Sequence, residues 1–246
     1  MIEKIDDLQA DEGQITTFIC HPERNGPHPV IIFFMDAPGI REELRDMARR
    51  FAASGYYVML PNLYYRSGVM ELGPVPAQDD VEAIQRIVSY IDTLTPSGVM
   101  ADCGVLLGYA DADEPASRGP AGTVGYCMSG RFAVYLAASH PGRIKAAGSI
   151  YGTWQITDRS DSPHLAALKA SAEFYFAFAE RDHFVPLDDA KRFKQAMITG
   201  RVNAEVEFYW GFEHGFAFPQ RAAYNKTAAE RHWERMLALF SRNLNN

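Results

Sequence analysis

The chain has 246 residues, of which 47% are hydrophobic and 22% are charged, and its formal net charge is −7 at pH 7. This composition is typical of a globular protein, and the acidic balance argues against a nucleic-acid partner, because a phosphate backbone requires a basic surface. The three cysteines are too few and too scattered for a disulfide framework or a thiolate zinc site.

The sequence favours a cytoplasmic protein. Residues 1–8 are charged and mostly acidic, and they lack the basic and apolar regions of a signal peptide. The longest uninterrupted apolar run, residues 30–35, is too short to cross a bilayer. We therefore expect no membrane partner, and we expect a monomer or a homodimer.

Apolar runs alternate along the chain with segments of helical periodicity. The runs predict strands at residues 15–20, 30–34, 56–60, 146–151, 173–179 and 206–210, with a further short run that ends at Gly125. Apolar residues at helical spacing predict helices at residues 44–55, 81–94, 99–109, 132–139, 188–199 and 224–244. Residues 62–78 and 111–120 are rich in Gly, Pro, Ser and Asp, which predicts loops. This alternation predicts an α/β fold, with a mainly parallel sheet that helices cover on both faces, and we expect one domain over residues 1–246.

The stretch around Cys127 has the pattern of a strand that turns abruptly into a helix. In such a nucleophile elbow the apex residue adopts strained backbone angles, so its near neighbours must be small. Gly125, Ser129 and Gly130 meet that requirement. A thiol at this apex would lie at a helix N-terminus, where the helix dipole favours the thiolate. The alternative is a buried core cysteine beside two unrelated glycines.

A nucleophilic cysteine needs a base, and the base needs an acid that orients it. Asp182 follows the predicted strand at residues 173–179, and His214 follows the one at residues 206–210. Both would therefore lie on loops after strands. The chain order of nucleophile, acid and histidine is that of an α/β-hydrolase.

Other assignments compete with this one. Asp182 could cap a helix that begins near Leu187, as Asp188 or Asp189 also could, and His214 could be an ordinary loop residue. His183 is the rival base, although side chains adjacent on the chain diverge, so Asp182 could not easily orient it.

Ser129 is the rival nucleophile. Cys127 and Arg131 occupy its flanking positions, which should be small in an elbow, and we therefore reject it.

Four strings of residues resemble the dienelactone hydrolase family, which has the α/β-hydrolase fold. They lie at residues 125–130, 182–186 and 214–216, with a further segment at residues 61–65. The resemblance runs from about Ile15 to the C-terminus and implies a hydrolase that cleaves an ester or lactone through an acyl-cysteine. Thioesterase, acyl transferase or peptidase-like activity on the same residues, or a non-catalytic binding protein, are the alternatives.

The resemblance also implies a role for individual residues. Cys127 would be the nucleophile, His214 the base and Asp182 the orienting acid, and the N–H groups of Met128 and Ala37 would form the oxyanion hole. No metal or organic cofactor is expected, because no histidine pair has ligand spacing and no glycine-rich phosphate loop precedes a helix.

The sequence departs from the family pattern at three positions, of which Ser129, in place of the usual second glycine, is a tolerable one. Asp36 stands where family members usually have a glutamate close to the thiol, so Asp36 is either a thiol partner or a solvated loop residue. Phe218 stands where dienelactone-specific enzymes have an arginine for the substrate carboxylate. Arg86 lies in the helix that could supply a second one, and either Arg86 or Arg221 could substitute from another direction. Aromatic residues near these motifs suggest an apolar pocket, with core packing as the alternative: Tyr64, Tyr65, Phe184, Phe216 and Phe218. We therefore expect neutral esters and lactones to be better substrates than an acidic dienelactone.

Overall fold

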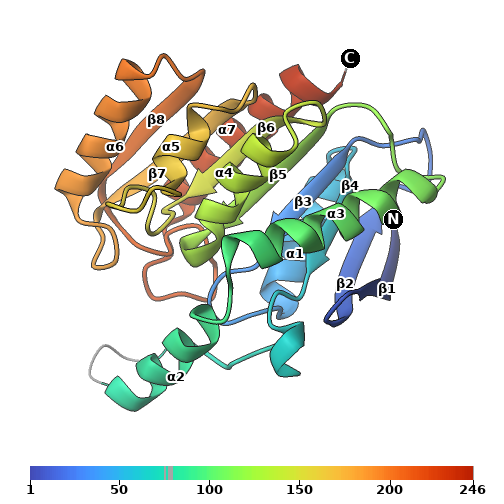
Figure 1. Cartoon of the computed structure of the whole chain (residues 1–246), viewed down its shortest axis with the longest axis horizontal. Coiled ribbons are helices and arrows are strands. Elements are labelled where there is room, and N and C mark those ends of the chain that lie inside the picture. The colour runs from blue at the N-terminus through green and yellow to red at the C-terminus, as the bar shows by residue number, and fades with distance from the viewer. Residues whose placement is uncertain (75, 77–79, 246) are drawn as a thin grey trace. The chain divides into compact units, whose positions relative to one another are not determined.

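The computed structural model describes residues 1–74, 76 and 80–245 (Figure 1). The chain divides into two compact units, Met1–Ser117 and Arg118–Asn246. Strands and helices alternate in both units, and parallel strand pairs occur in both, so the predicted α/β class is confirmed. The expectation of a single domain stays a prediction.

The first unit contains an antiparallel hairpin that continues into parallel strands. Its strands, in the order β1-β2-β4-β3, are β1 (Ile2–Ala10), β2 (Gly13–His21), β4 (Tyr57–Pro61) and β3 (Val30–Phe34). β2 pairs antiparallel with β1 and β4, whereas β3 and β4 pair in parallel. Every residue of β3 and β4 is buried, as their continuous apolar sequences predict. β1 was not predicted, because most of its residues are polar and only two of its nine are buried.

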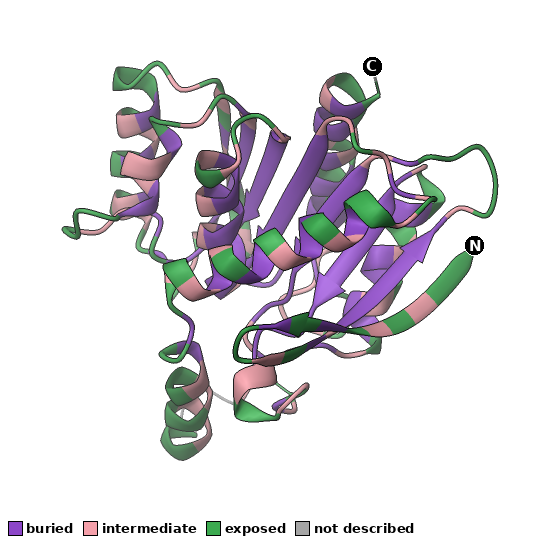
Figure 2. Ribbon diagram, turned by 45° about the vertical axis from the view of Figure 1, so that its right-hand side comes forward, coloured by how far each residue is buried: buried purple, intermediate pink, exposed green. Residues whose placement is uncertain are grey.

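The helices of the first unit are α1 (Glu42–Ala53), α2 (Val81–Ile91) and α3 (Pro96–Ala112), with a 3₁₀ turn η1 (Tyr65–Ser67). α3 begins before the predicted start, because Thr95 caps it by accepting the Gly98 N–H and Pro96 occupies its first turn. α2 ends three residues before the predicted end at residue 94 and is exposed along most of its length (Figure 2). Part of the predicted loop at residues 62–78, namely residues 75, 77 and 78, lies outside the described residues.

The second unit is built on parallel strands. They are, in spatial order, β5 (Ala121–Tyr126), β6 (Ile144–Ile150), β7 (Glu173–Arg181) and β8 (Ala204–Glu213). Its helices are η2 (Cys127–Ser129, a 3₁₀ turn), α4 (Gly130–Ser139), α5 (Pro163–Ala167), α6 (Leu187–Thr199) and α7 (Lys226–Leu244). The predicted elements are present with small shifts of their ends, while the short α5 was not predicted. No helix within the described ranges combines the length and apolar character needed to cross a membrane.

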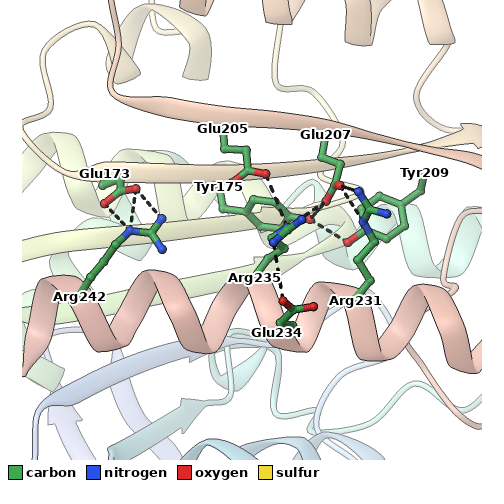
Figure 3. A network of polar contacts seen from close by, with 9 residues as sticks. All are labelled: Glu173, Tyr175, Glu205, Glu207, Tyr209, Arg231, Glu234, Arg235 and Arg242. Carbon is green, nitrogen blue, oxygen red and sulfur yellow. Dashed lines mark hydrogen bonds and ion pairs between the residues drawn. The ribbon is translucent and has the colours of Figure 1, made fainter.

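A polar network fixes α7 against β7 and β8 (Figure 3). The Tyr175 hydroxyl donates to Glu207 at 2.6 Å, and Arg231 pairs with the same carboxylate. Burial raises the pKa of Glu207, but the bonds from Arg231 and Tyr175 outweigh burial and lower it below the usual value. Further along α7, Arg242 binds Glu173. These pairs hold α7 in register with the strands, so its apolar side packs against β6 and β7.

Candidate active site

Cys127 stands at the apex of a strained turn between β5 and α4. Its φ is 54°, in the left-handed region that non-glycine residues rarely adopt. A Cβ on Gly125 would lie 2.3 Å from the Ser129 carbonyl oxygen, and one on Gly130 would lie 2.4 Å from the Ser149 hydroxyl oxygen. Both glycines are therefore needed for the backbone to approach this closely, as a nucleophile elbow requires.

Cys127 is also the most accessible of the candidate nucleophiles. Ser129 is fully buried, and its hydroxyl both donates to the Tyr126 carbonyl and accepts the Tyr126 N–H, at 3.0 and 3.1 Å. Cys20 and Cys103 are fully buried, whereas Cys127 is partly exposed. Burial raises the pKa of the Cys20 thiol to about 12 and raises that of Cys103 well above its ordinary value. Neither buried thiol is suited to nucleophilic attack, because the thiolate is the reactive form.

Asp182 and His214 meet on the loops that follow β7 and β8. His214 Nδ1 lies 2.7 Å from Asp182 Oδ2. The other carboxylate oxygen of Asp182 accepts the N–H groups of Phe184 and Val185, at 2.8 and 3.1 Å. These bonds hold Asp182 in a turn of its own. The following helix, α6, begins at Leu187 without a side-chain cap, so the capping alternative fails.

The second ring nitrogen of His214, Nε2, is not bound by Asp182. Nε2 is buried and forms no hydrogen bond with any part of the chain that the structure describes. Burial lowers the pKa of His214, but the charge of a Cys127 thiolate and the bond to Asp182 outweigh burial and raise it to about 10. His183, the rival base, is exposed.

Aromatic rings surround the His214 imidazole. Tyr151 lies 4.7 Å from it and Phe184 lies 4.9 Å from it, measured between ring centroids. Phe184 is 62% exposed, whereas Phe216 and Phe218 are buried and pack on Tyr151. Phe216 and Phe218 are thus placed in the core, in line with the packing alternative, and Phe184 stands at the surface beside the imidazole.

Asp36 in the first unit is bound by an arginine. Its carboxylate is fully buried and accepts both terminal nitrogens of Arg41, at 2.6 and 3.3 Å. Arg41 also pairs with Glu43 at 2.5 Å. The alternative of a solvated loop aspartate is therefore excluded. The sequence offered no signal for the partner beyond the presence of Arg41 five positions later.

The remaining candidates of the first unit have internal partners or are exposed. Tyr64 is fully buried, and its hydroxyl donates to the Ala37 carbonyl at 2.9 Å. The Tyr65 hydroxyl donates to Asp102 at 2.8 Å. Arg86 is exposed on α2. Tyr64 thus fixes the backbone at Ala37, which was expected to supply an oxyanion donor.

The sequence model of the dienelactone hydrolase family matches residues 15–244, a span that includes most of both units. This chain belongs to the dienelactone hydrolase family. Membership makes the protein a hydrolase of the dienelactone hydrolase type and its fold that of the α/β-hydrolases.

Individual relatives agree with this assignment. A protein of Synechocystis sp. named "Putative carboxymethylenebutenolidase" is 29% identical over 236 residues, which cover 94% of this chain and 93% of that one. A "Probable 2-oxo-3-(5-oxofuran-2-ylidene)propanoate lactonase" of Bradyrhizobium is 24% identical over 94% of this chain and 90% of its own. The crystal structure of a "Putative Dienelactone Hydrolase" from Klebsiella pneumoniae superposes with a TM-score of 0.85 at 26% identity and covers 98% of both chains.

Two residues with unusual backbone conformations in this member of the dienelactone hydrolase family were not predicted from its sequence. Tyr151 and Trp154, on the loop after β6, both have positive φ, at 39° and 54°. Their place directly after a predicted strand was the available signal, because loops at the carboxyl ends of parallel strands carry functional residues.

Within the described residues, no group of His, Cys, Asp or Glu side chains is arranged to hold a metal ion.

Proposed function

We propose that this member of the dienelactone hydrolase family cleaves a neutral ester or lactone through a Cys127–His214–Asp182 triad and an acyl-cysteine intermediate. The observation that carries the proposal is the Asp182–His214 bond at Nδ1, which leaves a buried, unbonded Nε2 whose protonation is coupled to the thiol. An orienting acid on one nitrogen and a free second nitrogen are what a general base requires.

The first half-reaction transfers the acyl group to sulfur. His214 Nε2 takes the proton of the Cys127 thiol, and the raised pKa of His214 favours this state before substrate binds. The thiolate attacks the carbonyl carbon, so a C–S bond forms and the C–O bond to the alcohol breaks. The departing oxygen takes the proton back from Nε2 and leaves as an alcohol.

The second half-reaction releases the acid. Water gives a proton to His214 Nε2 and attacks the acyl carbon, and the C–S bond breaks. The proton then returns to the Cys127 sulfur, which restores the thiol. In a lactone the alcohol and acid products stay in one molecule. The N–H of Met128, directly after the nucleophile, is the proposed oxyanion donor, and the second donor, Ala37, stays a prediction.

Two arginines that lie close in sequence to motifs of the first unit already have acidic partners, which disfavours their use for a substrate carboxylate. Arg41 binds Asp36 and Glu43, and Arg66 binds Asp102 through both terminal nitrogens, at 2.8 and 2.9 Å. A substrate carboxylate that is taken out of water needs such a cation. The relatives whose names denote butenolide and lactone hydrolases support the lactone or ester class.

Trapping the intermediate tests the proposal. Wild-type protein is mixed with p-nitrophenyl acetate, quenched in acid during turnover and mapped by mass spectrometry. We expect one acetyl group on the peptide that contains Cys127. Cys127→Ala should show neither acetylation nor turnover, while Cys103→Ala serves as the matched thiol control and should retain both. Turnover by Cys127→Ala at the wild-type rate would contradict the proposal.

A further inference from the structure

Trp154 adopts a costly backbone conformation while half of its side chain stays in water. Its φ of 54° lies in the left-handed region, where a bulky residue is a genuine outlier. Its indole is 47% exposed, so the burial of its own side chain does not compensate for that strain. Strained residues of this kind occur where a side chain must be presented to a ligand.

Contacts within the second unit hold Trp154 and its loop in place. The N–H of Thr153 donates to the Cys127 carbonyl at 3.0 Å, which ties the loop to the nucleophile's own backbone. The guanidinium of Arg131 stacks over the Trp154 ring at 4.9 Å. Gln155 is buried, and its amide donates to the Ser149 hydroxyl at 2.9 Å. These contacts hold Trp154 in this conformation.

The strained tryptophan borders a small hollow at the surface of the second unit. Aromatic and aliphatic side chains form most of its lining: Trp154, Phe178, Phe184, Val185 and Phe193. Phe178 and Phe193 are buried beneath, whereas Trp154 and Phe184 are 47% and 62% exposed, so an apolar occupant would remove aromatic surface from water.

One ring that lines the hollow, Phe184, also contacts the proposed proton donor. The Phe184 ring contacts the His214 imidazole at 4.9 Å, and the Phe184 N–H donates to Asp182. In the acylation step the departing oxygen must lie within hydrogen-bond reach of His214 Nε2, about 3 Å. A group attached to that oxygen is thereby brought next to Phe184.

We propose that this hollow is a subsite for a flat apolar group, in the first place an aromatic ring, on the alcohol side of the scissile bond. The ring would stack on Trp154 and Phe184. This inference rests on the proposed function, because the alcohol side is defined by proton transfer from His214. It adds a class of leaving group that the triad alone does not specify.

Two pairs of esters test the subsite. Benzyl acetate and ethyl acetate differ only in the alcohol, while methyl phenylacetate and methyl acetate differ only in the acid. We expect Trp154→Ala and, independently, Phe184→Ala to lower kcat/KM for benzyl acetate about tenfold relative to ethyl acetate, mainly through KM, as the loss of an aromatic contact predicts. The ratio within the acid pair should not change.

Trp210→Ala is the matched control, because Trp210 is 58% exposed but does not line the hollow, and it should leave both ratios unchanged. Equal losses on all four esters, or losses confined to the acid pair, would overturn the subsite assignment while the proposed function stands. If wild-type protein hydrolysed none of the four esters and formed no acyl-cysteine, both proposals would fall.

Discussion

Two buried aspartates, Asp36 after β3 and Asp182 after β7, have the same residue type and the same zero exposure of the side chain, but they have different partners. Asp36 binds Arg41 through both carboxylate oxygens. Asp182 binds His214 through one oxygen and two backbone N–H groups through the other. The partner, and not the carboxylate, decides what each site can do.

Arginine gives the first site a permanent positive charge. Burial lowers the pKa of Arg41, but Asp36 and Glu43 outweigh burial and raise it above its usual value, so no proton is exchanged near neutral pH. Histidine makes the second site titratable, with a pKa of about 10 for His214. The first arrangement can position a loop, whereas the second can also move a proton.

The largest expected effect comes from removing the titratable partner. His214→Ala should lower kcat about 10⁴-fold or more, because it removes the base in both half-reactions. His183→Ala, at the neighbouring exposed histidine, should stay close to the wild-type rate. Ester hydrolysis at saturating substrate measures both. An inactive His183→Ala together with an active His214→Ala would show that the base is assigned incorrectly.

The two aspartates can be compared by the same substitution. Asp182→Asn should lower kcat about 10²–10³-fold, because an amide no longer favours the protonated imidazole. Asp36→Asn should lower kcat less than tenfold but cost about 3 kcal/mol of unfolding free energy, because it disrupts a buried ion pair. Rates and urea unfolding distinguish the two. The account would be contradicted if Asp36→Asn lowered kcat more than Asp182→Asn did, with no change in the free energy of unfolding.

The pH dependence of His214 sharpens the comparison. Its pKa rises on folding from 6.5 to about 10, so the stabilisation is complete below pH 6.5 and is lost as the pH rises towards 10. Cys127→Ala removes the thiolate charge, so the pKa of His214 should fall and the loss of stability over this pH window should shrink. An NMR titration of the imidazole and urea unfolding at several pH values measure the two effects. An unchanged pKa in Cys127→Ala would contradict the coupling.

The smallest expected effect concerns substrate charge. Because internal carboxylates bind Arg41 and Arg66, the methyl ester of a lactone acid should have a kcat/KM about tenfold above that of the free acid. Steady-state kinetics on the matched pair measures this. A preference for the free acid that disappears in Arg86→Ala would restore a carboxylate-binding role for that exposed residue.

The sequence predicted the parts of this molecule that depend on local pattern. Cys127 was proposed as nucleophile because Gly125 and Gly130 mark a strand that turns into a helix. Asp182 and His214 were proposed as its partners because each follows an apolar strand. The chain order then predicted that Asp182 and His214 belong together. They lie 32 positions apart and are joined by a hydrogen bond.

The conformations of loops, the pairing of a polar strand and backbone strain were not predictable in the same way. The bond between Asp36 and Arg41 depends on how one loop folds back on a helix start. The positive φ of Trp154 accompanies its stacking with Arg131 and the bond from its neighbour Thr153 to the Cys127 carbonyl. The polar strand β1 has no strong apolar alternation, so only its pairing with β2 reveals it. The cytoplasmic location and the choice between monomer and homodimer stay predictions.

Thiol reactivity tests most directly whether Cys127 is a nucleophile activated by His214. Iodoacetamide at neutral pH, followed by peptide mapping over time, gives a rate for each cysteine. The account predicts that Cys127 reacts first, that the buried Cys20 and Cys103 lag far behind, and that His214→Ala slows Cys127 alone. Preferential labelling of Cys20 or Cys103, or a Cys127 rate that is indifferent to His214→Ala, would contradict it.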